Sequence, residues 1–96
     1  MDVLVAYDIA DTEGPGAQRL RQIADVCEKY GERVQFSVFE CRVSPERFGR
    51  LVGELQDVIK PQRDSVVIYR FAGEIQTART TLGRRRSHEL GEPWIL

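Results

Sequence analysis

The sequence contains few of the residues from which metal centres and redox sites are usually built. There are two cysteines, Cys27 and Cys41, and a single histidine, His88, among 96 residues. None of them has the short spacing of zinc ligands, so no zinc site is expected. We expect both cysteines to be buried free thiols, and His88, in a polar tail, to partner neither of them.

Long hydrophobic runs and an excess of charge are also missing. The longest apolar run, Val3–Tyr7, is far shorter than the roughly 20 residues of a membrane-spanning helix, and no basic segment leads into an apolar one as in a secretory signal. We therefore expect a cytoplasmic protein. The net charge of −1 gives no sign of a nucleic-acid partner. However, all 14 basic residues except Lys29 and Lys60 are arginines, whose planar guanidinium groups match phosphate oxygens.

What the sequence does contain is the composition of one globular domain. It is 42% hydrophobic and 30% charged, which is ordinary for a folded chain of this size and leaves no room for a second core. Because a small domain leaves much apolar surface open to water, a second copy that covers a sheet face or edge adds to its stability.

Two segments have apolar residues at the 3.6-residue period of a helix. The first spans Ala17–Tyr30, and we expect Gly31 to end it as a C-terminal glycine. The second begins after Ser44, a favourable N-cap residue, and ends before Pro61. Each helix therefore presents one apolar stripe to a core.

Other segments are rich in β-prone residues. Asp2–Ile9 is nearly continuous in apolar residues, which predicts a strand that is covered on both faces or lies in the centre of a sheet, and the loop Ala10–Gly16 follows it. Arg33–Val43 alternates and then changes phase, so it is one bent strand or two short ones. Arg63–Tyr69 is the next strand, and we expect a further short strand within Glu74–Leu82.

This order of elements predicts an α+β fold, a ferredoxin-like βαββαβ sandwich. In that fold two helices cover one face of a small antiparallel sheet, and the other face is bare. A second copy of the chain is the simplest cover for the bare face, so we expect a homodimer.

Asp8 is the most informative polar residue. It ends an apolar strand just before a glycine-containing loop, and strand ends present catalytic groups on rigid supports. One carboxylate is a weak Mg²⁺ site, but a twofold axis would bring two copies of Asp8 together. The alternative interpretation is an aspartate that caps a turn.

Several arginines lie near Asp8 in the predicted fold. Arg19 and Arg21 follow the loop on the first helix, and Arg33 opens the next strand, where all three would hold phosphate groups. Arginines on a solvated helix face are the alternative interpretation. Arg84–Arg86 form a second candidate phosphate contact.

The chain ends in the apolar segment Trp94–Leu96. An exposed large side chain there costs roughly 1.5–3 kcal/mol, so we expect the segment to be packed. We divide the chain into a ferredoxin-like domain, residues 1–82, and a tail, residues 83–96, that adds a strand to the edge of the partner protomer or contacts another protein.

Three segments of the sequence resemble a known family: YDI at Tyr7–Ile9, GERVQFSVFE at Gly31–Glu40 and RDSVVIYR at Arg63–Arg70. Together they are similar to the small CRISPR-associated proteins that partner the spacer integrase. These form the second-numbered family of that series and are often described as endoribonucleases. The resemblance covers the chain well up to Arg70 and the tail loosely.

The resemblance implies a ferredoxin-like fold with two strands between the helices and a tight homodimer packed sheet to sheet. It implies Mg²⁺-dependent cleavage of phosphodiester bonds, in single-stranded RNA or double-stranded DNA. It also implies a place in CRISPR spacer acquisition, where the dimer bridges two integrase dimers. A C-terminal strand that crosses to the partner would fall on Trp94–Leu96.

The resemblance also assigns site residues. The metal ligand and catalytic carboxylate of the first strand falls on Asp8, with Tyr7 beside it as a second catalytic group. The remaining residues bind phosphate or, in the case of the aromatic, lie near the substrate: Arg19, Arg21, Arg33 and Phe39.

Two other functions stay open. One is a non-catalytic scaffold, in which the dimer binds duplex DNA and bridges integrase dimers. The other is an RNA-binding or ligand-binding domain in which Phe36 and Phe39 stack on bases. The segment lacks the glycine–aromatic pattern of RNA-recognition sheets, so we assign Phe36 and Val38 to the core.

Overall fold

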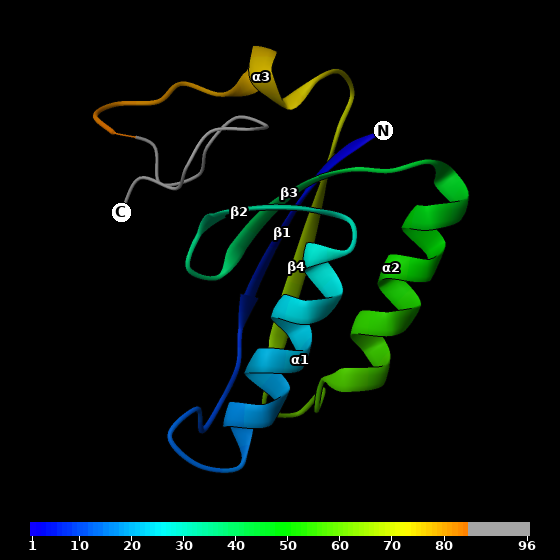
Figure 1. The fold of residues 1–96 in the computed structure, drawn as a ribbon. Helices are drawn as coiled ribbons and strands as arrows, with labels where there is room; N and C mark the ends of the chain where they lie inside the picture. The colour runs from blue at the N-terminus through cyan, green and yellow to red at the C-terminus, as the bar shows by residue number, and fades with distance from the viewer. Residues whose placement is uncertain (85–96) are drawn as a thin grey trace.

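Two helices cover one face of a four-stranded antiparallel sheet in the computed structural model, which describes residues 1–84 (Figure 1). The strand order is β2-β3-β1-β4, that of the predicted ferredoxin-like sandwich. No helix in this part of the chain is long and apolar enough to cross a membrane. The elements in chain order are β1 (Asp2–Asp8), α1 (Gly16–Glu28), β2 (Gly31–Gln35), β3 (Val38–Arg42), α2 (Pro45–Val58), β4 (Ser65–Phe71) and α3 (Ile75–Ala78).

The strand β1 is central, since it pairs with β3 on one side and β4 on the other. This position explains its nearly continuous apolar sequence. Val3, Val5 and Tyr7 are buried because alternate residues of a strand face the same side of the sheet, here the side that the helices cover. Leu4, Ala6 and Asp8 face the other side.

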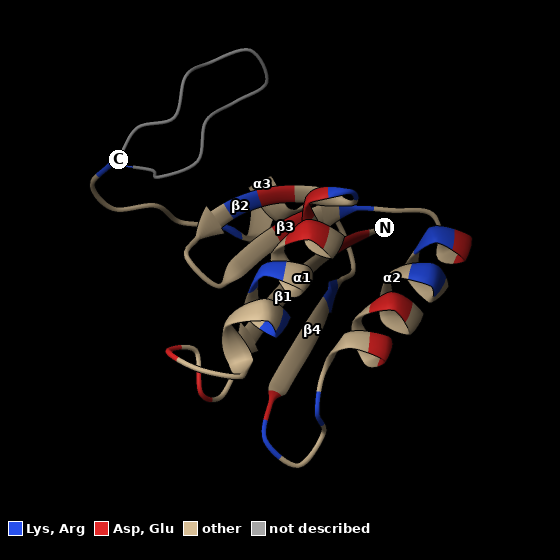
Figure 2. Cartoon of the chain, turned by 60° about the horizontal axis from the view of Figure 1, so that its bottom comes forward, with Lys and Arg blue, Asp and Glu red and all other residues tan. Residues whose placement is uncertain are grey.

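The helices pack on the sheet through the apolar stripes that the sequence predicts. Ile23 and Cys27 of α1, and Leu51 and Leu55 of α2, are almost completely buried. Charged residues of both signs lie along the two helices (Figure 2). The Ser44 hydroxyl accepts a hydrogen bond from the Arg47 N–H at 3.2 Å, so the predicted N-cap of α2 is confirmed.

Both cysteines are buried free thiols, as expected. Burial raises the pKa of the Cys27 thiol to about 12 and that of Cys41 to about 11. At neutral pH both are therefore protonated apolar side chains of the core.

Gly31 was expected to end the first helix, but it is the first residue of β2. α1 ends at Glu28, and the N–H of Tyr30 donates to the Cys27 carbonyl at 3.0 Å. A Cβ atom on Gly31 would lie 2.1 Å from the Glu40 carbonyl oxygen. Glycine is needed here because two strand backbones approach closely.

The segment Arg33–Val43 forms a hairpin of two strands, as the resemblance implies. The pairing of β2 with β3 shifts register between Arg33 and Gln35, which accounts for the change of phase in the sequence. Phe36 lies in the turn and is 72% exposed. The assignment of Phe36 to the core was therefore wrong, because the register shift moves it out of the alternating pattern.

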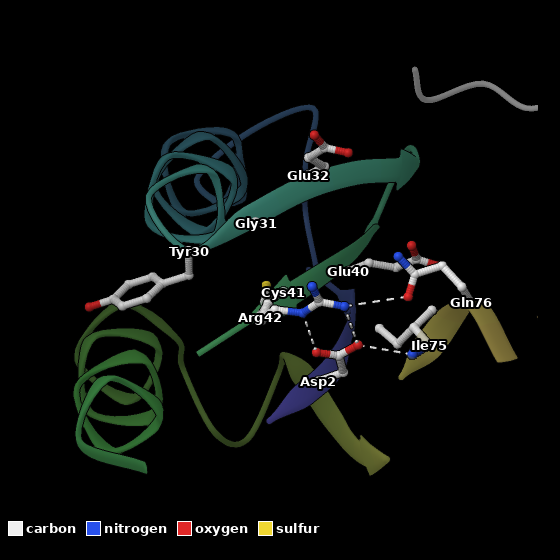
Figure 3. Close-up of a pocket in the computed structure, with 9 residues that line it drawn as sticks. All are labelled: Asp2, Tyr30, Gly31, Glu32, Glu40, Cys41, Arg42, Ile75 and Gln76. Carbon is white, nitrogen blue, oxygen red and sulfur yellow. Dashed lines mark hydrogen bonds and ion pairs between the residues drawn. The ribbon is translucent and has the colours of Figure 1, made fainter. Parts of the chain in front are cut away.

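The strand expected within Glu74–Leu82 is not present in the described residues, where this segment forms the short helix α3. The Asp2 carboxylate accepts the Ile75 N–H at 2.9 Å and the Arg42 Nε–H at 2.8 Å, as Figure 3 shows. Ile75 is buried. These contacts with Asp2, at the start of β1, hold the chain at Ile75 in a helical turn. They outweigh the local β-propensity of the segment.

The side chain of Asp64, just before β4, ties together the loops at one end of the sheet. Its carboxylate accepts from the Arg19 Nε–H at 2.8 Å and from the N–H groups of Ala10 and Lys60 at 3.0 and 2.9 Å. Arg19 also donates to the carbonyl groups of Ala10 and Pro15. The hydrogen bond from Arg19 holds the pKa of Asp64 well below its ordinary value, although burial acts in the opposite direction.

We expect Asp64→Asn to lower the free energy of unfolding by about 3 kcal/mol, because the change leaves the Arg19 charge buried without its partner. Urea denaturation followed by circular dichroism measures this loss. Arg63→Ala is the matched control, since Arg63 forms an exposed ion pair with Asp11 and its loss costs less than about 1 kcal/mol. Equal effects of the two variants would contradict the structural role of Asp64.

We also expect the fold to lose stability in acid. The hydrogen bond from Arg42 lowers the pKa of Asp2 to about 2, and that of Asp64 is lowered too. Carboxylates of this kind stabilise the fold fully above their unfolded pKa of about 3.9, and the contribution is lost as the pH falls through the folded pKa. The free energy of unfolding should drop below about pH 4, and less steeply in Asp2→Asn. A flat profile down to about pH 2 in the unmodified protein would show that these carboxylates contribute nothing.

Candidate active site

Asp8 is the last residue of β1 and is exposed to solvent. It pairs with Ser65, the first residue of β4. The loop that follows it is held by the Asp64 hydrogen bond to Ala10. The carboxylate is thus presented at the end of a rigid strand, as the sequence predicts.

The surface beside Asp8 is the side of the sheet that α1 and α2 do not cover. We call it the open face, and its residues include the apolar Leu4, Ala6, Val38, Val67 and Tyr69, with Glu40 opposite Leu4. Val67 is 42% exposed and Tyr69 is 56% exposed. Exposed apolar residues gathered on one sheet face are typical of an interaction surface.

The segment that follows β4 covers one end of the open face. Ile75 and Ala78 of α3 line a hollow there together with Leu4 and Phe71. Arg79 lies 3.6 Å from the Glu40 carboxylate and fixes this segment on β3. The end of the sheet near Asp8 stays uncovered by residues 1–84.

The other predicted residues lie on the opposite side of β1. Tyr7 faces the helices, and its ring packs against Phe39 at a centroid distance of 6.3 Å. The Arg33 guanidinium lies 5.1 Å from the Phe39 ring centroid. Tyr7, Arg33 and Arg21 line one cavity beside α1. The structure therefore brings these three together and separates their side chains from that of Asp8 by the thickness of the sheet.

Two of the residues predicted to contact the substrate, Phe39 and Arg19, are buried. Phe39 is fully buried, so the exposed aromatic residue of the hairpin is Phe36. Arg19 is also buried, and its donors are directed to Asp64, Ala10 and Pro15. Its phosphate-binding role stays a prediction, and in this structure Arg19 holds the loop that follows Asp8.

The role of Asp64 and the exposure of Phe36 were not predicted from the sequence. Asp64 stands in a polar stretch of loop, where nothing local marks its carboxylate as the partner of Arg19, 45 residues away. The tail residues Arg85, Arg86, His88 and Trp94–Leu96 lie outside the described part of the chain. The predicted domain boundary at residue 82 and the crossing strand are therefore left as predictions.

The donor set of one chain is small. Residues 1–84 contain no group of three or more His, Cys, Asp or Glu side chains that could hold a metal ion. One exposed carboxylate at a strand end is what each copy supplies, and Mg²⁺ is often held by one or two carboxylates while it keeps several waters. The residues present fit such a site with one carboxylate for each copy, and a second copy would add its own Asp8.

The comparisons with known proteins agree with this architecture. The family model of CRISPR associated protein Cas2 matches residues 1–78. The chain is 50% identical over 97 residues to the CRISPR-associated endoribonuclease Cas2 of Chlorobaculum tepidum, covering 100% of both chains. It is 39% identical over 95 residues to the CRISPR-associated endonuclease Cas2 of Halalkalibacterium halodurans, covering 99% of each.

Solved structures show the same fold. The crystal structure of Streptococcus pyogenes Cas2 superposes with a TM-score of 0.77 at 44% identity, over 86% of this chain and 100% of that one. A Thermus thermophilus protein matches with a TM-score of 0.73 at 32% identity, over 88% and 92% of the two chains. The chain therefore belongs to the Cas2 family of CRISPR-associated proteins.

Proposed function

We propose that this protein is a metal-dependent endonuclease that acts in CRISPR spacer acquisition together with the spacer integrase. Its reaction is hydrolysis of phosphodiester bonds, in single-stranded RNA or double-stranded DNA. The observation that carries the proposal is the position of Asp8, exposed at the rigid end of β1 and beside the uncovered open face. The nuclease names of the Cas2 relatives support the class of reaction.

The active form in this proposal is a homodimer joined through the open face. Burial of side chains such as Val67 and Tyr69 supplies the driving force, at about 25 cal/mol for each Å² of apolar surface removed from water. Sheets that pack face to face lie about 10 Å apart. The two Asp8 side chains, which emerge from the same faces that meet, are then brought towards each other across the twofold axis.

The pair of Asp8 carboxylates would hold the Mg²⁺ ion. When bound, the ion supplies a water of lowered pKa and offsets the negative charge of the phosphate group. Arg21 and Arg33 bind the nucleic acid beside α1. Arg19 acts through Asp64, since their ion pair holds the loop that follows Asp8 and so keeps the carboxylate in place.

We expect Asp8→Asn to abolish metal-dependent cleavage, because the amide cannot supply the negative charge that binds Mg²⁺. Cleavage of a labelled single-stranded RNA and of a labelled DNA duplex, each with and without Mg²⁺, measures this. Asp57→Asn is the matched control, since Asp57 lies on α2 and is exposed. Unchanged cleavage by folded Asp8→Asn protein would refute the mechanism and favour the non-catalytic scaffold.

We expect Val67→Glu to dissociate the homodimer, because a charge at the centre of the open face is desolvated when two sheets meet. Sedimentation measures the change from twice the chain mass to the single-chain mass of 11.0 kDa. Arg50→Glu on the exposed side of α2 is the control and should leave the dimer intact. A Val67→Glu protein that stays dimeric would place the interface elsewhere.

A further inference from the structure

A cavity of about 350 Å³ lies between α1 and the β2–β3 hairpin, which are neighbours in Figure 1. It opens on the helix side of the sheet, so it is separate from the open face and from Asp8. Polar and apolar groups both line it. Its lining residues of the strands and hairpin are Tyr7, Arg33 and Phe36, and those of α1 include Arg21, Asp25 and Glu28.

Two buried polar atoms at this cavity have no partner within residues 1–84. They are the Tyr7 hydroxyl and the Arg33 Nε atom. Tyr7 is only 7% exposed, and an unpaired polar group at such a depth costs free energy. Burial raises the pKa of Tyr7, and the interaction of its hydroxyl with Arg33 offsets part of the rise. Both atoms are enclosed by protein, so a ligand would meet the rest of the Arg33 side chain, which lines the cavity.

An aromatic surface adjoins these groups. The Arg33 guanidinium lies between two rings, 5.1 Å from the centroid of Phe39 and 5.8 Å from that of Phe36. The first ring is buried and the second is 72% exposed. A planar group that enters from solvent can therefore stack on Phe36 or on the guanidinium plane, as unpaired bases do on RNA-binding proteins.

The charges at the cavity select against a bare phosphate group. Arg21 and Arg33 are positive, but Asp25 and Glu28 line the same cavity and are negative. A phosphate would be repelled by the two carboxylates. A neutral planar ligand with hydrogen-bond acceptors on one edge and donors on another satisfies both kinds of side chain.

We propose that this cavity binds a single unpaired guanine base of a nucleic-acid strand, with Phe36 as its stacking surface. Guanine offers two acceptors, O6 and N7, to Arg33, as in the commonest arginine–base contact. Its N1–H and N2 amino groups are donors for Asp25 or Glu28. The inference rests on the proposed function in one respect, that the protein binds nucleic acid, and it names the feature of the strand that the protein reads.

The test is a binding titration in EDTA, where metal-dependent cleavage does not occur. The probes are fluorescein-labelled RNA decamers of uridine that carry one central guanosine, one central adenosine or only uridine, and a ten-base-pair duplex. We expect the guanosine decamer to bind at least fivefold more tightly than the other single strands and than the duplex. Fluorescence anisotropy gives each dissociation constant.

Variants locate the binding at the cavity. Phe36→Ala should weaken guanosine-decamer binding about tenfold. Phe36→Tyr, which keeps an aromatic ring, should bind the decamer as tightly as the unmodified protein. Arg33→Lys keeps the positive charge but removes the planar guanidinium proposed to bond O6 and N7, and it should reduce the preference for guanosine about threefold. Arg50→Ala is the control, because α2 contributes no residue to the cavity.

Equal affinity for all single strands, unchanged by Phe36→Ala, would overturn the proposal. The proposal would also be overturned if the duplex bound most tightly and Phe36→Ala left its affinity unchanged, because binding would then depend on phosphates alone. Failure of the nuclease proposal is recognised separately. Asp8→Asn would then leave cleavage unchanged while the preference for guanosine in EDTA persists.

Discussion

The alternation of side chains along β1 is the constraint on which the rest of the structure depends. Tyr7 and Asp8 are neighbours in sequence, yet one is buried under the helices and the other is exposed on the open side of the sheet. Since β1 is hydrogen-bonded to strands on both sides, a slip of one residue would reverse both faces. The fold therefore fixes two separate surfaces, one on each side of the sheet, on which the proposed functions rest.

The two surfaces have different physical character. The open face is largely apolar, with Asp8 at one end and the Glu40–Arg79 ion pair towards the other. The cavity beside α1 is polar and aromatic, and charged side chains of both signs line it. The ion pair of Arg19 with Asp64 lies between the loops at the end of β1 and connects the stability of the domain to the position of Asp8.

Patterns that act over a few residues were predictable from the sequence. The helical stripes, the Ser44 cap and the apolar central strand all follow from local periodicity, and the bare sheet face follows from the order of elements. Contacts between distant segments were not predictable in the same way. Gly31 lies against the Glu40 backbone, Arg19 is bonded to Asp64, and Asp2 holds the start of α3. None of these partners is a near neighbour in sequence, so the residue types alone did not decide between two or more roles for Gly31, Arg19 and the α3 segment.

A single chain holds only half of the proposed active site. Each copy supplies Asp8 at the end of the open face, and no group of three or more potential metal ligands lies in the part of the chain described. In the proposed homodimer, the open face beside Asp8 would supply both the reason for two copies to associate and the geometry that brings their carboxylates together. The proposal thus links stability, assembly and chemistry through the same strand.

The most direct test of this claim is the distance between the two copies of residue 8 in solution. A nitroxide label on Asp8→Cys, with Cys27 and Cys41 buried and protonated, allows that distance to be measured by pulsed electron paramagnetic resonance. We expect one short distance between the two labels. It is determined by the spacing of packed sheets, about 10 Å, and by the length of the two label arms. The absence of dipolar coupling, or a long distance of the kind expected from association through the helices, would contradict it.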